Sequence, residues 1–132
     1  MIELIFLGQF ILAFFLGAIL GFQRERAGKA AGPRTYGIVS AGACLFTILS
    51  ISAFGADTAR VAAGIVTGIG FLGAGMIMRK TDRIEGLTTA AGFWIVSAIG
   101  MAVATEFYIL SVGATLIILI ALTINDDRFA KK

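Results

Sequence analysis

Residues 64–75 read Gly64-Ile65-Val66-Thr67-Gly68-Ile69-Gly70-Phe71-Leu72-Gly73-Ala74-Gly75, inside an apolar run that extends from residue 61 to residue 78. Five glycines in twelve residues disfavour a helix in water, because each costs roughly 1 kcal/mol relative to alanine. In a bilayer, unpaired backbone groups cost more than this, so the segment is expected to remain helical. Glycine then lets neighbouring helices approach closely. The stretch therefore predicts a membrane helix with intimate neighbours.

The glycines of this stretch fall on two sides of the predicted helix. At about 100° per residue, Gly64, Gly68 and Gly75 share one face, whereas Gly70 and Gly73 lie roughly opposite. A helix with small residues on both sides is expected to touch neighbours on both, which predicts a position at the centre of a small bundle. The alternative is a broken helix whose exposed backbone lines a substrate site. The sequence leaves open whether this helix is continuous.

The composition indicates an integral membrane protein. Of the 132 residues, 58% are hydrophobic and 14% are charged, against roughly 45–50% and a quarter in soluble domains. The chain has no histidine, so the usual near-neutral proton relay is missing. Its one cysteine, Cys44, excludes an intrachain disulfide, and its apolar surroundings predict a buried, inert thiol.

Five apolar runs approach the twenty or so residues that cross the hydrocarbon core. They cover residues 4–22, 36–54, 61–78, 87–104 and 107–124. We therefore predict an all-α fold, in which residues 1–124 form a single polytopic five-helix transmembrane bundle and residues 125–132 a short charged tail. The Gly17/Gly21 pair indicates a packing face on the first helix. Gln9 is expected to hydrogen-bond across helices, and the fifth helix to face lipid.

The distribution of basic residues predicts the topology. The segments 23–34, 79–86 and 125–132 hold ten of the eleven Lys and Arg residues, and the alternate side holds only Arg60. By the positive-inside rule, the N-terminus lies outside and the C-terminus in the cytoplasm. This pattern also accounts for the net charge of +3, so we expect no nucleic-acid partner. The basic cytoplasmic face keeps open a lipid-active role.

Two helix starts on the cytoplasmic side could hold an anion. Thr35 stands near the start of the second helix, and Thr88 and Thr89 stand near the start of the fourth. Helix N-termini present free amide donors and partial positive charge. Formal charge is added by Arg34, Arg79, Lys80 and Arg83. These residues fit either an anion or headgroup site, or simple helix caps and topology signals.

The acidic residue Glu25 has three readings. It can turn toward the second helix and pair with Arg34 as a structural clamp. It can instead join Asp82 or Glu85 as an oxygen ligand of a hydrated Mg²⁺, which keeps several waters and needs only one or two carboxylates. The third reading is a solvated surface charge. The sequence spacing specifies no metal site.

No catalytic constellation is present. HExxH, GxSxG and P-loop motifs are missing, and the GxGxxG match formed by Gly68, Gly70 and Gly73 lies in an apolar span after no predicted strand. Asp57 and Arg60 fit an exposed ion pair or a cap of the third helix. We therefore expect a protein that is not an enzyme.

Several stretches carry a family resemblance. They are Gly21-x-x-Arg24-Glu25-Arg26, Ala31-Gly32-Pro33-Arg34-Thr35, Asp57-x-x-Arg60, Gly68-Ile69-Gly70-Phe71-Leu72-Gly73-Ala74-Gly75-Met76-Ile77 and Gly86-Leu87-Thr88-Thr89-Ala90-Ala91-Gly92-Phe93-Trp94. In this order they resemble the MgtC/SapB family of bacterial inner-membrane proteins. The sequence departs from the family pattern at three positions. Gln23 stands where the family usually has glutamate. Leucine is common at the position of Pro33, and glutamine at the position of Gly64.

The resemblance implies a five-helix inner-membrane protein linked to Mg²⁺ homeostasis and adaptation to low Mg²⁺, and in pathogens to virulence. It implies a regulator that contacts membrane proteins such as the membrane sector of the F-type ATP synthase. The alternative is a small oligomeric transporter or channel for Mg²⁺ or another ion. Expected partners are the bilayer, further copies of the chain through glycine faces, and a membrane protein. No cofactor is expected apart from Mg²⁺ itself.

The resemblance also nominates motif residues without settling their roles. They are Arg24, Glu25, Arg34, Thr35, Asp57, Arg60, Gly68, Gly70, Gly73, Gly75, Thr88, Thr89 and Trp94. Several relatives carry a soluble C-terminal domain. The sequence here ends eight residues after the fifth predicted span, so we expect no such domain in this chain and assume no regulation by one.

Overall fold

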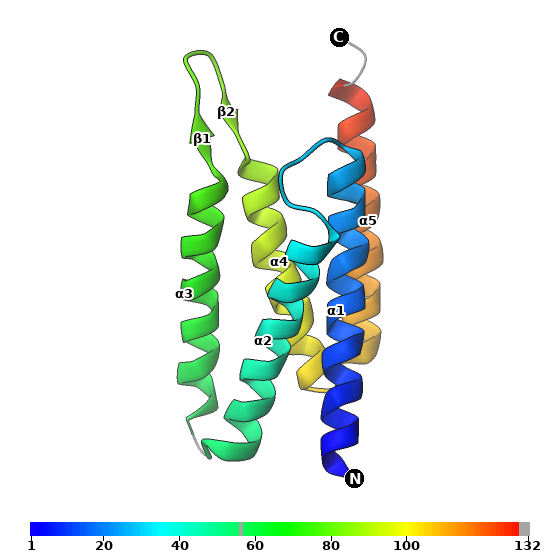
Figure 1. Ribbon diagram of the computed structural model, residues 1–132, viewed down its shortest axis with the longest axis vertical. Helices are drawn as coiled ribbons and strands as arrows, with labels where there is room; N and C mark the ends of the chain where they lie inside the picture. Colours follow the sequence, from blue (N-terminus) through cyan, green and yellow to red (C-terminus); the bar gives the residue numbers. More distant parts are fainter. Residues whose placement is uncertain (56, 130–132) are drawn as a thin grey trace.

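The computed structural model describes residues 1–55 and 57–129, of which residues 125–129 are described by their backbone only. In this part of the chain, five helices run roughly side by side (Figure 1). They are α1 (Ile2–Arg26), α2 (Pro33–Ala53), α3 (Thr58–Met76), α4 (Leu87–Ala104) and α5 (Tyr108–Phe129). Two short strands, β1 (Met78–Arg79) and β2 (Ile84–Glu85), join α3 to α4.

The helices confirm the predicted all-α membrane fold, with shifted boundaries. Helices α1 to α4 are long and apolar enough to cross a membrane, and the apolar part of α5, Tyr108–Ile124, is shorter. Helix α4 has the predicted bounds, and α1 continues past the predicted end at residue 22 to Arg26. Pro33 begins α2 because the first turn needs no amide donor there. Helix α5 extends to Phe129, so the predicted tail begins as helix, and its residues 130–132 lie outside the described residues.

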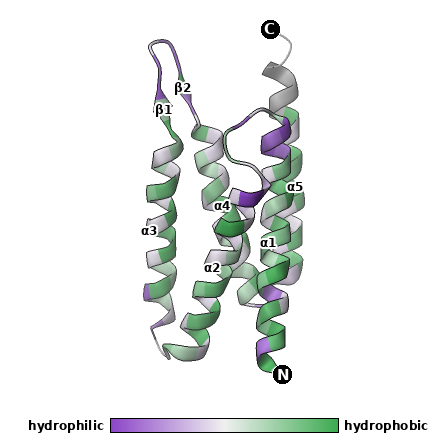
Figure 2. Ribbon diagram, viewed as in Figure 1, coloured by the Kyte–Doolittle hydropathy of each residue, from purple (hydrophilic) through white to green (hydrophobic). Residues whose placement is uncertain are grey.

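The charged segments lie together at one end of the bundle. The loop after α1, the β1–β2 hairpin and the described end of α5 share one end in Figure 1, and the N-terminus, the end of α2 and the start of α3 share the other. Hydrophilic ribbon concentrates at the first end in Figure 2. This grouping agrees with the alternation predicted from the basic residues. Which end faces the cytoplasm stays a prediction.

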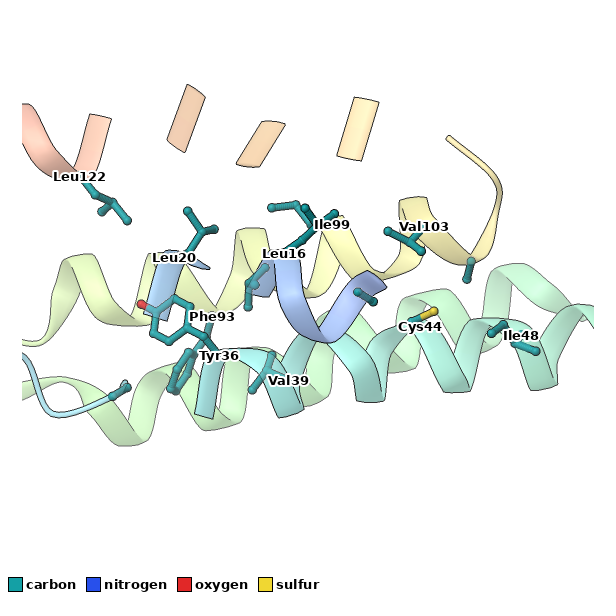
Figure 3. Packing of buried hydrophobic residues seen from close by; sticks show 14 residues of the cluster. Leu16, Leu20, Tyr36, Val39, Cys44, Ile48, Phe93, Ile99, Val103 and Leu122 are labelled. Carbon is teal, nitrogen blue, oxygen red and sulfur yellow. The ribbon is translucent and has the colours of Figure 1, made fainter. Parts of the chain in front are cut away.

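The core lies among α1, α2 and α4 (Figure 3). Leu20, Tyr36, Cys44, Val96 and Val103 are all fully buried there. About half of the apolar part of α2 and of α4 is inside the protein, compared with 17% for α3. Cys44 is therefore buried as predicted, and α2 and α4 are the central helices.

The predicted central position of the glycine-rich helix is wrong. Helix α3 lies at the edge of the bundle (Figure 1), and among its residues only Gly73 is buried. Phe71 is 81% exposed, and Ile69 and Met76 are only partly buried where they pack against the core. The alternative of a broken helix, which the sequence left open, does not hold, because α3 is continuous from Thr58 to Met76. Glycines allow close approach but supply no apolar surface that would draw a helix into a core.

The charged loop predicted over residues 79–86 contains a small β-hairpin. Met78 pairs with Glu85 and Arg79 with Ile84, and the Lys80 amide donates to the Arg83 carbonyl at 2.8 Å. Gly86 then has φ +85°, and an added Cβ would collide with the Met76 carbonyl. Only glycine accommodates this close turn into α4.

Candidate functional site

A fully buried arginine joins three helices at the charged end of the bundle. Arg24, in the last turn of α1, is 1% exposed. Its Nη2 donates to Thr89 Oγ1 of α4 at 3.5 Å, and the Tyr36 hydroxyl of α2 donates to the Thr89 carbonyl at 3.2 Å. A buried charge is costly unless it is hydrogen-bonded, so this network fixes how α1, α2 and α4 meet. We call Arg24, Tyr36 and Thr89 the polar junction.

Small residues make room for the polar junction. A Cβ added to Gly21 would lie 2.7 Å from Pro33 Cα, and one added to Gly92 would collide with the Tyr36 hydroxyl. The Tyr36 ring also packs edge to face against Phe93, with 5.2 Å between ring centroids. The Gly17/Gly21 packing face predicted from sequence is therefore confirmed, with α2 as its partner.

The structure brings only part of the predicted motif set together. Arg24 and Thr89 meet in the polar junction, whereas Arg34, Thr35 and Thr88 are exposed. Trp94 is 56% exposed on α4. No ion pair of the described residues includes Arg34, and the anion or headgroup site at the two helix starts stays a prediction.

Glu25 does not clamp Arg34. No ion pair between them occurs among the described residues, and Glu25 is exposed, with Oε1 3.3 Å from where a Cβ on Gly32 would stand. The reason is geometric: α1 stays helical to Arg26, so Glu25 lies beside the backbone of the loop rather than beside the Arg34 side chain.

The other metal-ligand candidates lie in the hairpin. The carboxylate of Glu85 receives Lys80 Nζ and Arg83 Nη2, both at 2.8 Å. The hydrogen bond from Lys80, with the charges of Lys80 and Arg83, holds the pKa of Glu85 below its ordinary value of 4.5. Asp82 is exposed. No group of three or more His, Cys, Asp or Glu that could hold a metal occurs in the described part of the chain, so the metal site stays a prediction.

The opposite end of the bundle holds simpler polar contacts. Asp57 and Arg60 form an exposed ion pair at 3.2 Å, as predicted. Gln9 Nε2 donates to the Tyr108 hydroxyl at 3.0 Å and thereby links α1 to α5, which confirms the predicted contact across helices.

Sequence reasoning missed Tyr36, whose hydroxyl completes the polar junction. In the sequence, Tyr36 is simply one aromatic residue within the apolar run 36–54. A tyrosine buried in a membrane helix usually needs a partner for its hydroxyl, and this was the available signal. The pairing with α4 itself depends on the tertiary packing.

An open groove separates α2 from α3, and we call it the α2–α3 groove. It has a volume of about 560 Å³ and is lined by Val39, Gly42 and Ala43 of α2 and by Gly64 and Gly68 of α3, among other apolar residues. A Cβ on Gly42, Gly64 or Gly68 would meet no described atom within 4 Å. By contrast, Gly73 lies against Ala90 of α4, 3.4 Å from its carbonyl oxygen. The glycine motif is thus mostly unpartnered within the described chain.

The fold and the polar junction define a class: a small polytopic membrane protein whose helices are joined by one buried basic network. The model of the MgtC family matches residues 10–128 of the sequence. The chain belongs to the MgtC family.

Curated relatives agree with this assignment. The chain is 38% identical over 88% of its length to an Escherichia coli K12 protein named "Putative magnesium transporter YhiD", of which it covers 60%. It is 40% identical over 84% of its length to MgtC of Salmonella typhimurium, of which it covers 48%, and 34% identical over 87% to SrpB of Synechococcus elongatus, of which it covers 71%. It thus spans about half to three fifths of YhiD and MgtC. No solved structure matches.

Proposed function

We propose that this protein acts in Mg²⁺ homeostasis in the bacterial inner membrane as a non-enzymatic regulator that binds other membrane proteins. Its membership of the MgtC family and the magnesium-related name of its relative YhiD support the Mg²⁺ link. The membrane sector of the F-type ATP synthase is the partner class that the family resemblance puts first.

The α2–α3 groove is the observation that carries this proposal. Gly42, Gly64 and Gly68 expose backbone to the groove without an occupant in the described chain. Helix association in membranes depends on such small residues, because they let backbones come into van der Waals contact. A transmembrane helix of a partner can therefore enter where a larger side chain would block it.

Two variants of α3 test this proposal. Gly68→Leu fills the groove, whereas Gly70→Leu adds the same side chain on the opposite face, and neither glycine has a described atom near its Cβ position. Both variants should therefore insert and fold. The full chain is affinity-purified from its membrane, and co-purified subunits of the ATP synthase membrane sector are quantified by mass spectrometry.

The expected result is capture by the native chain and by Gly70→Leu, with at least a tenfold loss for Gly68→Leu. A strain that lacks this protein should grow at low Mg²⁺ when it expresses the native chain or Gly70→Leu, and should grow less well when it expresses Gly68→Leu. Equal capture by the two variants, or no capture by the native chain, would contradict the proposal.

Ion transport is a second candidate, favoured by a row of buried polar side chains on α2. Ser40, Thr47 and Ser50 are 0%, 8% and 2% exposed, and the hydroxyls of Ser40 and Ser50 have no partner among the described atoms. Polar groups without a partner are costly inside a membrane protein, and an ion in transit would supply a partner for these hydroxyls. Gly100 packs directly against the Ser40 backbone and closes the row there. Thr47 and Ser50, by contrast, line a cavity of about 320 Å³ between the end of α2 and the start of α3.

Proteoliposomes loaded with a Mg²⁺ indicator distinguish the two candidates. A regulator gives no flux above empty liposomes from folded, inserted protein. Flux that is lost in Ser40→Ala or Glu25→Gln would replace the regulator with a transporter.

A further inference from the structure

A second groove runs between α1 and α5 at the charged end of the bundle, and we call it the α1–α5 groove. Its volume is about 730 Å³. Phe15, Ile19 and Phe22 of α1 and Leu119 of α5 form much of its wall, and Arg26 stands at its end. Figure 1 shows these two helices side by side.

The wall changes from apolar to basic along a single face of α1. Phe15, Ile19, Phe22 and Arg26 follow one another at helical spacing, so they share one face. The eleven-residue step from Phe15 to Arg26 covers about 16 Å of helix axis at roughly 1.5 Å per residue. An amphiphile with an apolar chain and one charged end matches this arrangement.

The charge of Arg26 is available to a ligand. Its guanidinium carbon lies 5.5 Å from the centroid of the Phe22 ring, a cation–π contact that keeps the cation above the apolar wall. None of the ion pairs of the described residues includes Arg26. An anion at this position gains a charge-assisted bond without breaking an existing ion pair.

We propose that the α1–α5 groove binds an anionic phospholipid, with an acyl chain against Phe15, Ile19 and Leu119 and the phosphate at Arg26. Basic pockets between membrane helices bind anionic headgroups in this way. A zwitterionic lipid fits less well, because its headgroup also brings a cation toward the guanidinium.

Native mass spectrometry tests whether the α1–α5 groove binds an anionic phospholipid. The full chain is released from detergent micelles for the measurement. The chain is titrated with phosphatidylglycerol or with phosphatidylcholine that has the same acyl chains. Loss of one cation near the membrane surface should weaken phosphatidylglycerol binding about fivefold in Arg26→Gln. The matched variant Arg34→Gln removes an exposed cation that does not line the groove, and should change binding less than twofold.

A second pair of variants tests whether the acyl chain of the lipid occupies the groove. Ala18→Phe fills it, because Ala18 lines its wall, and should abolish phosphatidylglycerol retention. Gly8→Phe adds the same ring to an open position of α1 and should leave retention intact. Equal retention of the two lipids, equal effects of Arg26→Gln and Arg34→Gln, or competition by inorganic phosphate would each overturn the proposal.

Discussion

Two GxxxG pairs of the same spacing have opposite environments. Gly17 and Gly21 of α1 are buried against α2, where an added Cβ on Gly21 would lie 2.7 Å from Pro33 Cα. Gly64 and Gly68 of α3 face the open α2–α3 groove, where an added Cβ would meet no described atom within 4 Å. The GxxxG spacing shows that another helix can approach the backbone closely. It does not show whether that helix belongs to the same chain or to a partner.

The surroundings of each pair explain the difference. Near Gly21 lie the fully buried Leu20 and Arg24, which give α1 both apolar area and hydrogen bonds to bury against its neighbours. Near Gly68, Phe71 and Leu72 are exposed. In this protein, the glycine pair whose neighbouring residues are buried packs against another helix of the same chain. The pair whose neighbours are exposed is left open to a partner.

The largest expected effect comes from a bulky residue at the buried pair. Gly21→Leu must displace the backbone of residues 32–33, which cannot shift easily, and should destabilise the bundle by about 3 kcal/mol, the upper end of the usual overpacking cost. The matched Gly64→Leu meets open space and should change stability by less than about 0.5 kcal/mol. The fraction of monodisperse protein on size exclusion and the unfolding midpoint in mixed micelles measure both. Similar losses in the two variants would break the comparison.

The polar junction should show the next largest effect. Arg24→Gln removes the buried guanidinium that bonds Thr89, and hydrogen bonds to charged groups contribute about 1.5–3 kcal/mol. Arg34→Gln removes an exposed cation at the same end of the bundle and should cost less than about 0.5 kcal/mol. Unfolding in mixed micelles compares them, and an equal cost would mean that burial of Arg24 has no energetic consequence.

Removing one tyrosine hydroxyl at each end of the bundle compares how much the two ends contribute to stability. Tyr36→Phe keeps the ring packed on Phe93 but loses the buried bond to the Thr89 carbonyl, and should cost about 1 kcal/mol, in the upper part of the range for bonds between membrane helices. Tyr108→Phe loses the bond from Gln9 and should cost about 0.6 kcal/mol, the average for bonds between membrane helices. The same unfolding assay measures both variants, and a reversed order would place the firmer end of the bundle at Gln9.

The smallest effect concerns pH and the hairpin that connects α3 to α4. The pKa of Glu85 in the folded hairpin lies below 4.5, first because Lys80 donates to its carboxylate. A lowered pKa in the folded state means that this stabilisation is complete above pH 4.5 and is lost as the pH falls through the folded-state pKa. Amide chemical shifts of residues 79–85 should follow this loss, and Glu85→Gln should abolish their pH dependence. An unchanged dependence in the variant would assign it to another group.

The sequence predicted the parts of the structure that depend on local chemistry. Apolar run lengths identified the helices, and the Gly17/Gly21 spacing, the Gln9 contact and the Asp57–Arg60 pair were all found as expected. Each of these depends on residues close in sequence or on the cost of polar groups in lipid, which a single chain reveals.

The parts that depended on helix pairing were not predicted. Periodicity correctly separated Gly68 from Gly73 on α3, but it could not say that α4 would cover only Gly73. Likewise, Tyr36 reaches Thr89 because two helices distant in sequence cross at Gly92. Many packing contacts together decide which helix faces meet. The spacing of residues along one helix does not reveal the contacts that it makes with the others.

The unfilled α2–α3 groove makes any association on this face an exchange reaction. In a bilayer, acyl chains occupy the space that no described side chain fills, so a helix that enters must release them. The equilibrium then depends on the mole ratio of lipid to partner and on how well a given acyl chain fits between Gly42 and Gly68. Diluting the membrane with lipid should dissociate a complex formed here, even when both proteins remain fully folded.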